Sequence, residues 1–318
     1  MGTPLADMTD TKVCLSSRGA QSSPRPAFLV IRRNARMTLF ALSVLLGCVA
    51  CAANSPTVST TTGSWIQVWS DEFTGPPGAS IDTTKWRFDL GDGCASGNCG
   101  WGNNEKEYYR DASENIALNG QGQLQIVARI APPPVGLTCY YGPCRYTSAK
   151  ITTQRKEYFA PGRVEARIKL SAGQGLWPAF WLLGKSFPPW PDCGELDVME
   201  NKGSAPTRTS SSVHGPGYFG NTPITHVQTF VRGSAADAFH TYAVEWDSLH
   251  IRFFVDDTVH YAVTRSEVEA HGRWVFDQPF FVILNLAVGG NFDGDPQSDA
   301  VFPATLLVDY VRVYRRAQ

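Results

Sequence analysis

The chain has 318 residues, of which 43% are hydrophobic, so it can bury one large core or two smaller ones. Its 29 Gly and 21 Pro suit a turn-rich globular protein and exclude a collagen-like or wholly disordered chain. The formal net charge of −1 argues against a nucleic acid as the main partner.

The first 53 residues have the pattern of a secretion signal. A basic flank that includes Arg32, Arg33 and Arg36 precedes an apolar run from Leu39 to Ala53, which ends in small residues. The run is short for a membrane span. We therefore expect 1–53 to be an N-terminal extension plus signal, and the mature protein to be secreted. The late position of the signal predicts that translation starts downstream of Met1.

Two cleavage patterns compete within this signal. Leu45-Leu-Gly-Cys48 resembles a lipoprotein box, which would make Cys48 a lipid-anchored N-terminus. Ordinary cleavage near Ala50-Cys-Ala52 would release the protein instead. Residues 54–63 then form a Ser/Thr-rich tether, and 64–318 a single domain without a second linker or repeat.

Export also determines how the cysteines are interpreted. Cys94 and Cys99 form one close pair, and Cys139 and Cys144 another, each in a Gly-containing loop. In an oxidising compartment two local disulfides are expected. A four-Cys zinc site is the alternative, although no Cys-x2-Cys spacing supports it. Cys193 is left over and is expected to be a buried thiol.

The mature region is patterned as strands. Alternating or continuous apolar segments are bounded by Gly, Pro or Asp, and only 266–271 resembles a helix. The strand-like segments are 124–130, 163–170, 280–288, 305–314, and 251–263 as two strands around an Asp256-Asp257 turn. Many strands and hardly a helix predict an all-β, two-sheet antiparallel β-sandwich.

One strand-like segment carries three carboxylates, Glu195, Asp197 and Glu200. Residues two apart share a face of a strand, whereas residues five apart do not. A β-bulge with Val198 or Met199 as the extra residue would return Glu200 to the face of Glu195. Their backbones would then be about 13 Å apart, and inclined side chains could approach the roughly 5–5.5 Å of a retaining glycosidase.

The run Glu195-Leu-Asp-Val-Met-Glu200 resembles the catalytic signature of glycoside hydrolase family 16, in its laminarinase-like, bulged form. Further segments agree in order over about 64–316, among them Gly100-Trp-Gly-Asn-Asn-Glu105, Gly173-Gln-Gly-Leu-Trp-Pro-Ala-Phe-Trp181, Val213-His-Gly-Pro-Gly-Tyr218 and Leu284-Asn-Leu-Ala-Val-Gly-Gly290. The resemblance implies a concanavalin-like jelly roll with an open substrate cleft on its concave face.

The resemblance also implies an activity, that of a secreted retaining endo-β-1,3-glucanase acting on glucans such as laminarin. Glu195 would be the nucleophile and Glu200 the acid/base, with Asp197 assisting. This chemistry needs no metal or redox cofactor. We expect a monomer whose partner is the polysaccharide, with no nucleic acid or protein partner.

Substrate and metal ligands follow from the same resemblance. Trp190 and Trp274 match sugar-stacking positions, and Asn104 and Arg163 match polar contacts on the non-reducing side. Weaker candidates are His214, Gln278 and Trp177, and Trp181 is expected to pack in the core. A structural calcium would be bound by Asp309, with Glu72 and the Gly122 carbonyl as partners.

Two other functions are left open by the sequence. A mixed-linkage β-1,3(4)-glucanase would use the same chemistry. A non-catalytic β-1,3-glucan-binding protein would share the fold, but such proteins typically lack one or both acids that this chain retains. The partition between hydrolysis and transglycosylation is also undetermined by the sequence.

Overall fold

The computed structural model describes residues 64–131, 136–185, 189–297 and 302–317. The predicted signal (1–53), with its lipoprotein box at Cys48, and the tether (54–63) lie outside these residues. Strands are by far the commonest regular elements of the described residues, and among these residues no helix is long and apolar enough to cross a membrane.

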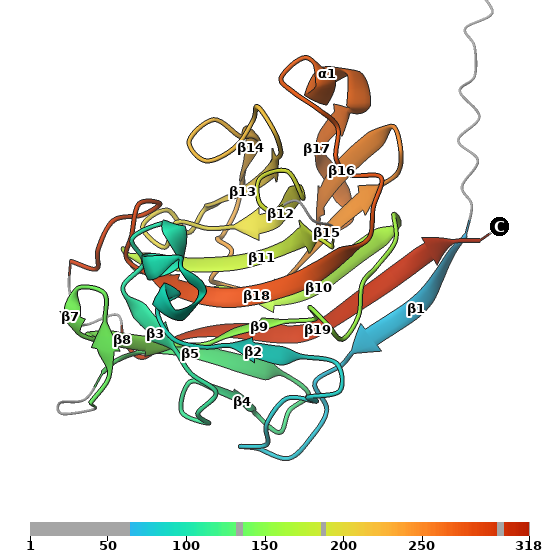
Figure 1. The fold of residues 1–318 in the computed structure, drawn as a ribbon. Coiled ribbons are helices and arrows are strands. Elements are labelled where there is room, and N and C mark those ends of the chain that lie inside the picture. The colour runs from blue at the N-terminus through green and yellow to red at the C-terminus, as the bar shows by residue number, and fades with distance from the viewer. Residues whose placement is uncertain (1–63, 132–135, 186–188, 298–301, 318) are drawn as a thin grey trace, which may run out of the picture. The chain divides into compact units, whose positions relative to one another are not determined.

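Two large sheets make up the fold (Figure 1). The ten-stranded sheet has the order β17 (Thr258–Thr264), β16 (His250–Val255), β15 (His240–Trp246), β10 (Arg163–Lys169), β19 (Ala304–Arg316), β5 (Leu124–Ile130), β8 (Tyr146–Ser148) and β3 (Glu107–Tyr109), with β1 (Trp65–Asp71) added on β19 and β4 (Ile116–Leu118) on β5. The seven-stranded sheet has the order β14 (Ile224–Thr229), β13 (Arg208–His214), β12 (Glu195–Glu200), β11 (Leu176–Gly184), β18 (Phe280–Val288), β9 (Lys150–Thr152) and β2 (Arg87–Asp89).

The strands predicted from periodicity are confirmed as β5, β10, β16, β17, β18 and β19. Asp256 and Asp257 form the predicted turn, and both have a left-handed backbone, with φ values of 49° and 61°. The predicted short helix is α1 (Arg265–Glu269), which Thr264 and Glu267 cap reciprocally. One pair departs from the antiparallel prediction, because β3 runs parallel to β8.

The core is built from one face of each sheet. Val164, Ala166 and Ile168 alternate on β10, and Phe180 and Leu182 alternate on β11; all five are fully buried in one apolar cluster. Strand alternation turns the residues between them to the opposite faces. Each sheet therefore has a core face and an outer face, and the outward-facing residues of β11 and β12 can build a site without entering the core.

Both predicted disulfides are confirmed, and they exclude the zinc alternative. Cys94–Cys99 joins the 3-10 turns η1 (Cys94–Ser96) and η2 (Cys99–Gly102). Cys139–Cys144 closes the hairpin of β6 (Thr138–Cys139) and β7 (Gly142–Pro143).

Replacing Phe180 by Ala tests the assignment of the core. Because the ring is fully buried, the substitution should lower the free energy of unfolding by about 3–5 kcal/mol. Phe239→Ala is the matched control, since that half-buried ring lies against Arg167 on the outer face of the ten-stranded sheet, and it should cost less than about 1 kcal/mol. Denaturant titration measures both. Equal losses would contradict the assignment.

Candidate active site

The pairing of β12 with β11 determines where its carboxylates point. Leu183 lies opposite Glu195, and Ala179 lies opposite Glu200. Five steps along β12 thus match four along β11, because Val198 has no partner there and forms the extra residue of a β-bulge. The predicted bulge is confirmed, and it brings Glu195 and Glu200 to the same face of the sheet.

Asp197 lies on this face as well. It is opposite Trp181 of β11 and Ser212 of β13, whereas Val198 and Met199 are both buried in the core. We call the outer face of the seven-stranded sheet around Glu195, Asp197 and Glu200 the site face.

Each of the three carboxylates has a nitrogen neighbour from another element. The indole N–H of Trp190 donates to Glu195 Oε2 over 2.5 Å, and that of Trp177 donates to Glu200 Oε1 over 3.0 Å. The Nε2 atom of His214 lies 3.0 Å from Asp197 Oδ2. A donated hydrogen bond stabilises the ionised form of a carboxyl group, so the two indole contacts favour negative charge on Glu195 and Glu200.

Burial works in the opposite direction. It raises the pKa of Glu195 to about 8, with the charge of Asp197 adding to the rise, and it raises the pKa of Asp197 to about 7. Burial and the charges of Asp197 and Glu195 also hold the pKa of Glu200 well above its usual range. The three acids therefore do not all ionise near neutral pH, and the cluster keeps at least one proton.

A cluster with both charge and proton can perform two tasks at once. One glutamate can act as a carboxylate nucleophile while the other donates a proton. The nucleophile must be ionised, and a proton held on Asp197 would remove the repulsion that opposes ionisation of Glu195. The bulged strand thus supplies the pair of acids required for double displacement at a sugar carbon.

Several predicted sugar contacts lie where a ligand could reach them. Trp190 is 44% exposed, and its ring meets the exposed ring of Phe219 edge-on at 5.5 Å. Asn104 is exposed and donates to Asn291 over 2.9 Å. Trp177 and His214 are half-buried on the site face beside Glu200 and Asp197.

Two predicted contacts are wrong. Trp274 is only 5% exposed and belongs to the core cluster, with its N–H donated to Asp277, so its ring offers no face to a sugar. Arg163 lies on β10 of the other sheet and alternates with the core residue Val164, so it points to the outer face there. Its guanidinium group is paired with Glu165 and Glu245.

Gln278 has a role in the frame of the site. Its amide donates to the carbonyls of Cys193 (2.7 Å) and Val275 (2.9 Å), and so braces the segment that leads into β12. Gly184 permits the close approach of that segment, since a Cβ atom there would lie 1.8 Å from the Cys193 carbonyl oxygen. Cys193 is confirmed as a buried free thiol. Burial, with the charge of Glu195, raises its pKa to about 11, so it stays a neutral thiol near pH 7.

The expectation that Trp181 packs in the core is also wrong. It shares the site face with Asp197 and donates to Asn285 over 2.8 Å. The ammonium group of Lys150, which the sequence did not single out, lies 5.1 Å from the Trp181 ring and 4.1 Å from the ring of Trp101. The even spacing of Trp177 and Trp181 was a usable signal, because residues four apart on a strand share a face.

The predicted calcium ligands do not form a site in the structure described. Asp309 pairs with Arg167 over 2.6 Å, and Glu72 accepts two hydrogen bonds from Arg312. Gly122 lies in a turn with φ of 76°. Across the described ranges no three His, Cys, Asp or Glu side chains are grouped to hold a metal ion. Both carboxylates are instead neutralised by guanidinium groups.

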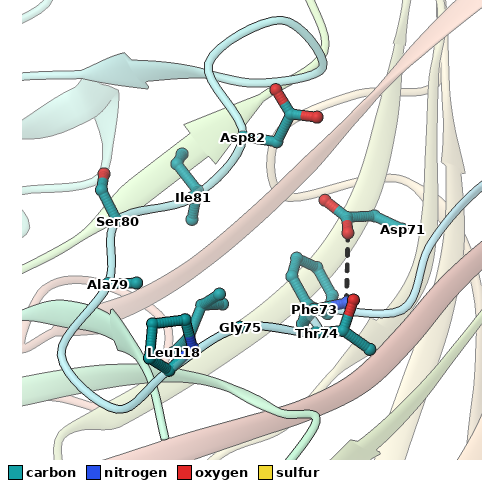
Figure 2. A pocket seen from close by; sticks show the side chains of 10 residues that line it. Asp71, Phe73, Thr74, Gly75, Ala79, Ser80, Ile81, Asp82 and Leu118 are labelled. Carbon is teal, nitrogen blue, oxygen red and sulfur yellow. Dashed lines mark hydrogen bonds between the residues drawn. The ribbon is translucent and has the colours of Figure 1, made fainter. Parts of the chain in front are cut away.

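A separate hollow of about 220 Å³ lies away from β12 (Figure 2). Phe73, Ile81 and Leu118 line it with apolar surface, and Asp71 and Asp82 are also among its lining residues. Asp71 accepts hydrogen bonds from the Phe73 and Trp86 N–H groups, and Asp82 from Thr84, so these carboxylates already serve the local fold. The hollow offers no pair of free acids.

Two glutamates on one face of a β-sandwich strand, with an aspartate between them, supply the pair of catalytic carboxyl groups that a retaining glycoside hydrolase requires. The sequence profile of "Glycosyl hydrolases family 16" matches residues 98–311. A "Beta-glucanase" of Rhodothermus marinus is 39% identical over 304 residues, covering 90% of this chain and 96% of that protein.

Solved structures agree with these sequence matches. The laminarinase catalytic domain from Thermotoga maritima is 39% identical with a TM-score of 0.74, over 80% of this chain and 99% of that one. The endo-beta-1,3-glucanase from Pyrococcus furiosus is 43% identical with a TM-score of 0.73, over 80% and 95%. The chain belongs to glycosyl hydrolase family 16.

Replacing Asp197 by Asn tests the electrostatic coupling in the cluster. The charge of Asp197 raises the pKa of Glu195, so its removal should lower that pKa and move the acidic limb of the kcat/KM profile to lower pH, by about one unit. Ser212→Ala, which removes an uncharged group opposite Asp197, should leave the limb in place. Rates of glycan hydrolysis across pH measure both. If the acidic limb of the Asp197→Asn variant lay at the same pH as in the wild type, the coupling would be refuted.

Proposed function

We propose that this protein is a secreted retaining endo-β-1,3-glucanase that uses Glu195 as nucleophile and Glu200 as acid/base. The observation that carries the proposal is the β-bulge at Val198, which aligns both glutamates on the site face with Asp197 between them. The similar proteins named laminarinase and endo-beta-1,3-glucanase support β-1,3-glucan as the substrate.

In the first step Glu200 gives its proton to the glycosidic oxygen as the bond to the anomeric carbon breaks. The Glu195 carboxylate bonds to that carbon from the opposite side and forms a glycosyl ester. In the second step Glu200, now ionised, takes a proton from water. The resulting hydroxyl attacks the anomeric carbon, and Glu195 leaves as a carboxylate. Two inversions retain the configuration.

The environments of the two glutamates suit these tasks. Trp190 donates to Glu195 and favours the anion that the nucleophile must be. Glu200 is held protonated by burial and by its acidic neighbours, as an acid must be before the first step. Asp197 lies between them, beside His214, where it can take up the proton that Glu195 must release.

A mixed-linkage β-1,3(4)-glucanase is the second candidate, because the Rhodothermus marinus relative is named only a beta-glucanase. The two differ in the linkages that their sugar-binding surface accepts, not in the acids. Comparing laminarin, lichenan and carboxymethyl-cellulose separates them. Activity on laminarin alone supports the first, activity on laminarin and lichenan the second, and inactivity on laminarin contradicts the proposed function.

Exogenous azide tests the two roles. Glu195→Ala should lower laminarin hydrolysis by at least about 10³-fold, and azide filling the space of the nucleophile should give an α-glycosyl azide. Glu200→Ala should lower it about 10²–10⁴-fold, and azide replacing water in the second step should give a β-glycosyl azide. NMR of the anomeric proton distinguishes the products. Exchanged anomers would reverse the assignment.

Secretion is proposed on the N-terminal pattern of 1–53. Mass spectrometry of the mature N-terminus discriminates a free end near Ala52 from a lipid-modified Cys48. A structural calcium also stays a prediction, and it would require Asp309 and Glu72 to leave their arginines. A melting temperature raised by calcium and restored by a chelator would support it.

A further inference from the structure

The proposed acid/base is connected to a loop that takes no part in the chemistry described so far. Trp177, whose N–H donates to Glu200, stacks its ring on Phe292 at 4.6 Å between centroids and 27° between planes. Phe292 is half-buried and belongs to the segment 289–295, which follows β18. The ammonium group of Lys202, two residues after Glu200, lies 4.8 Å from the Phe292 ring.

The segment that carries Phe292 is fixed by the residue next to it. The Asp293 carboxylate accepts hydrogen bonds from the backbone N–H of Gly175 (2.9 Å), from that of Ser204 (3.0 Å) and from the Ser204 hydroxyl. Gly175 immediately precedes β11, which carries Trp177, and Ser204 follows β12, which carries Glu200. One side chain therefore ties together the three loops around the acid/base.

Backbone hydrogen bonds complete this frame. Gly203 donates to the Leu176 carbonyl over 2.8 Å, and Gly173 donates to Gly203 over 2.9 Å. On the other side of the segment, Asn291 donates to the Asn103 carbonyl over 2.8 Å, and Gly289 to that of Gly175 over 2.7 Å. The position of the Phe292 ring is thus fixed by its loop, and the ring in turn supports one face of Trp177.

We propose that Phe292 is a positioning residue, which holds Trp177 so that its indole N–H orients the Glu200 carboxyl group for proton transfer to the departing oxygen. The inference rests on the proposed function of Glu200. Without the stacked ring, Trp177 is free to rotate. The Glu200 carboxyl group then lacks a fixed hydrogen-bond donor, so it is less often oriented for proton transfer to the glycosidic oxygen.

Leaving-group dependence tests the inference with the full chain. We expect Phe292→Ala to lower kcat/KM on laminarin about 10-fold, because its alkoxide must be protonated as it leaves. On 2,4-dinitrophenyl β-laminaribioside, whose phenolate departs without a proton, kcat/KM should change less than about 3-fold. This parameter reports the first step alone, so slower deglycosylation does not affect it.

The pH profile supplies a second readout. Trp177 stabilises the Glu200 anion, so a loosened hydrogen bond should raise the pKa of Glu200 and move the alkaline limb of kcat/KM to higher pH. Phe292→Trp, which keeps an aromatic face, should restore both the laminarin rate and the limb. Trp177→Phe, which removes only the donor, should reproduce the effect of Phe292→Ala.

Phe239→Ala is the matched control, because it removes a half-buried ring far from β12 in the sequence and on the other sheet, and it should behave as wild type. Equal losses on both substrates, a change confined to KM, or wild-type rates in Phe292→Ala would each overturn the inference. Asp293→Ala should show the same selective loss even if Phe292→Ala does not fold. A Glu200→Gln variant that retained laminarin hydrolysis would instead refute the proposed function.

Discussion

The site depends on a mismatch in length between two paired strands. A regular β12 would direct Glu195 and Glu200 to opposite sides, one of them into an apolar core where an unpaired carboxyl group is strongly disfavoured. The extra residue at Val198 removes this conflict, and the apolar side chains of Val198 and Met199 occupy the core side of the bulge together. The same bulge thus keeps apolar side chains in the core and places Glu195 and Glu200 on one face of the sheet.

Once the acids are on one face, their burial and mutual repulsion set the chemistry. These effects favour protonation, whereas Trp190 and Trp177 each donate to one glutamate and favour charge. The opposed influences leave a cluster that holds charge and proton together. Reactivity therefore arises from the surroundings of the carboxyl groups as much as from their presence.

The sequence was informative where a local rule applied. The bulge could be predicted because the five-residue spacing conflicts with strand alternation. The disulfides could be predicted because short Cys pairs lie in loops of a chain whose N-terminal pattern predicts secretion. Trp181 was misplaced because an apolar stretch does not reveal which of its faces is buried. Trp274 was misplaced because a matching position in the family does not reveal whether the side chain is buried here. For Arg163, alternation with Val164 indicates an outward direction, but only strand order shows that it belongs to the other sheet. The contact between Phe292 and Trp177 could not be predicted, because it joins a loop and a strand that are far apart in the sequence.

Alternation along β11 also has a consequence for how such an enzyme can change. Phe180 and Leu182 pack the core, while Trp177 and Trp181 line the site face. Substitution of Trp181 leaves the core residues Phe180 and Leu182 in place, so the site face can change there while the scaffold stays intact, whereas Trp177 is also tied to Glu200. Strand β12 lacks this independence, because Val198 and Met199 are core residues and the bulge there also places Glu200 on the site face. That strand is expected to be the least tolerant of insertion or deletion in the sheet.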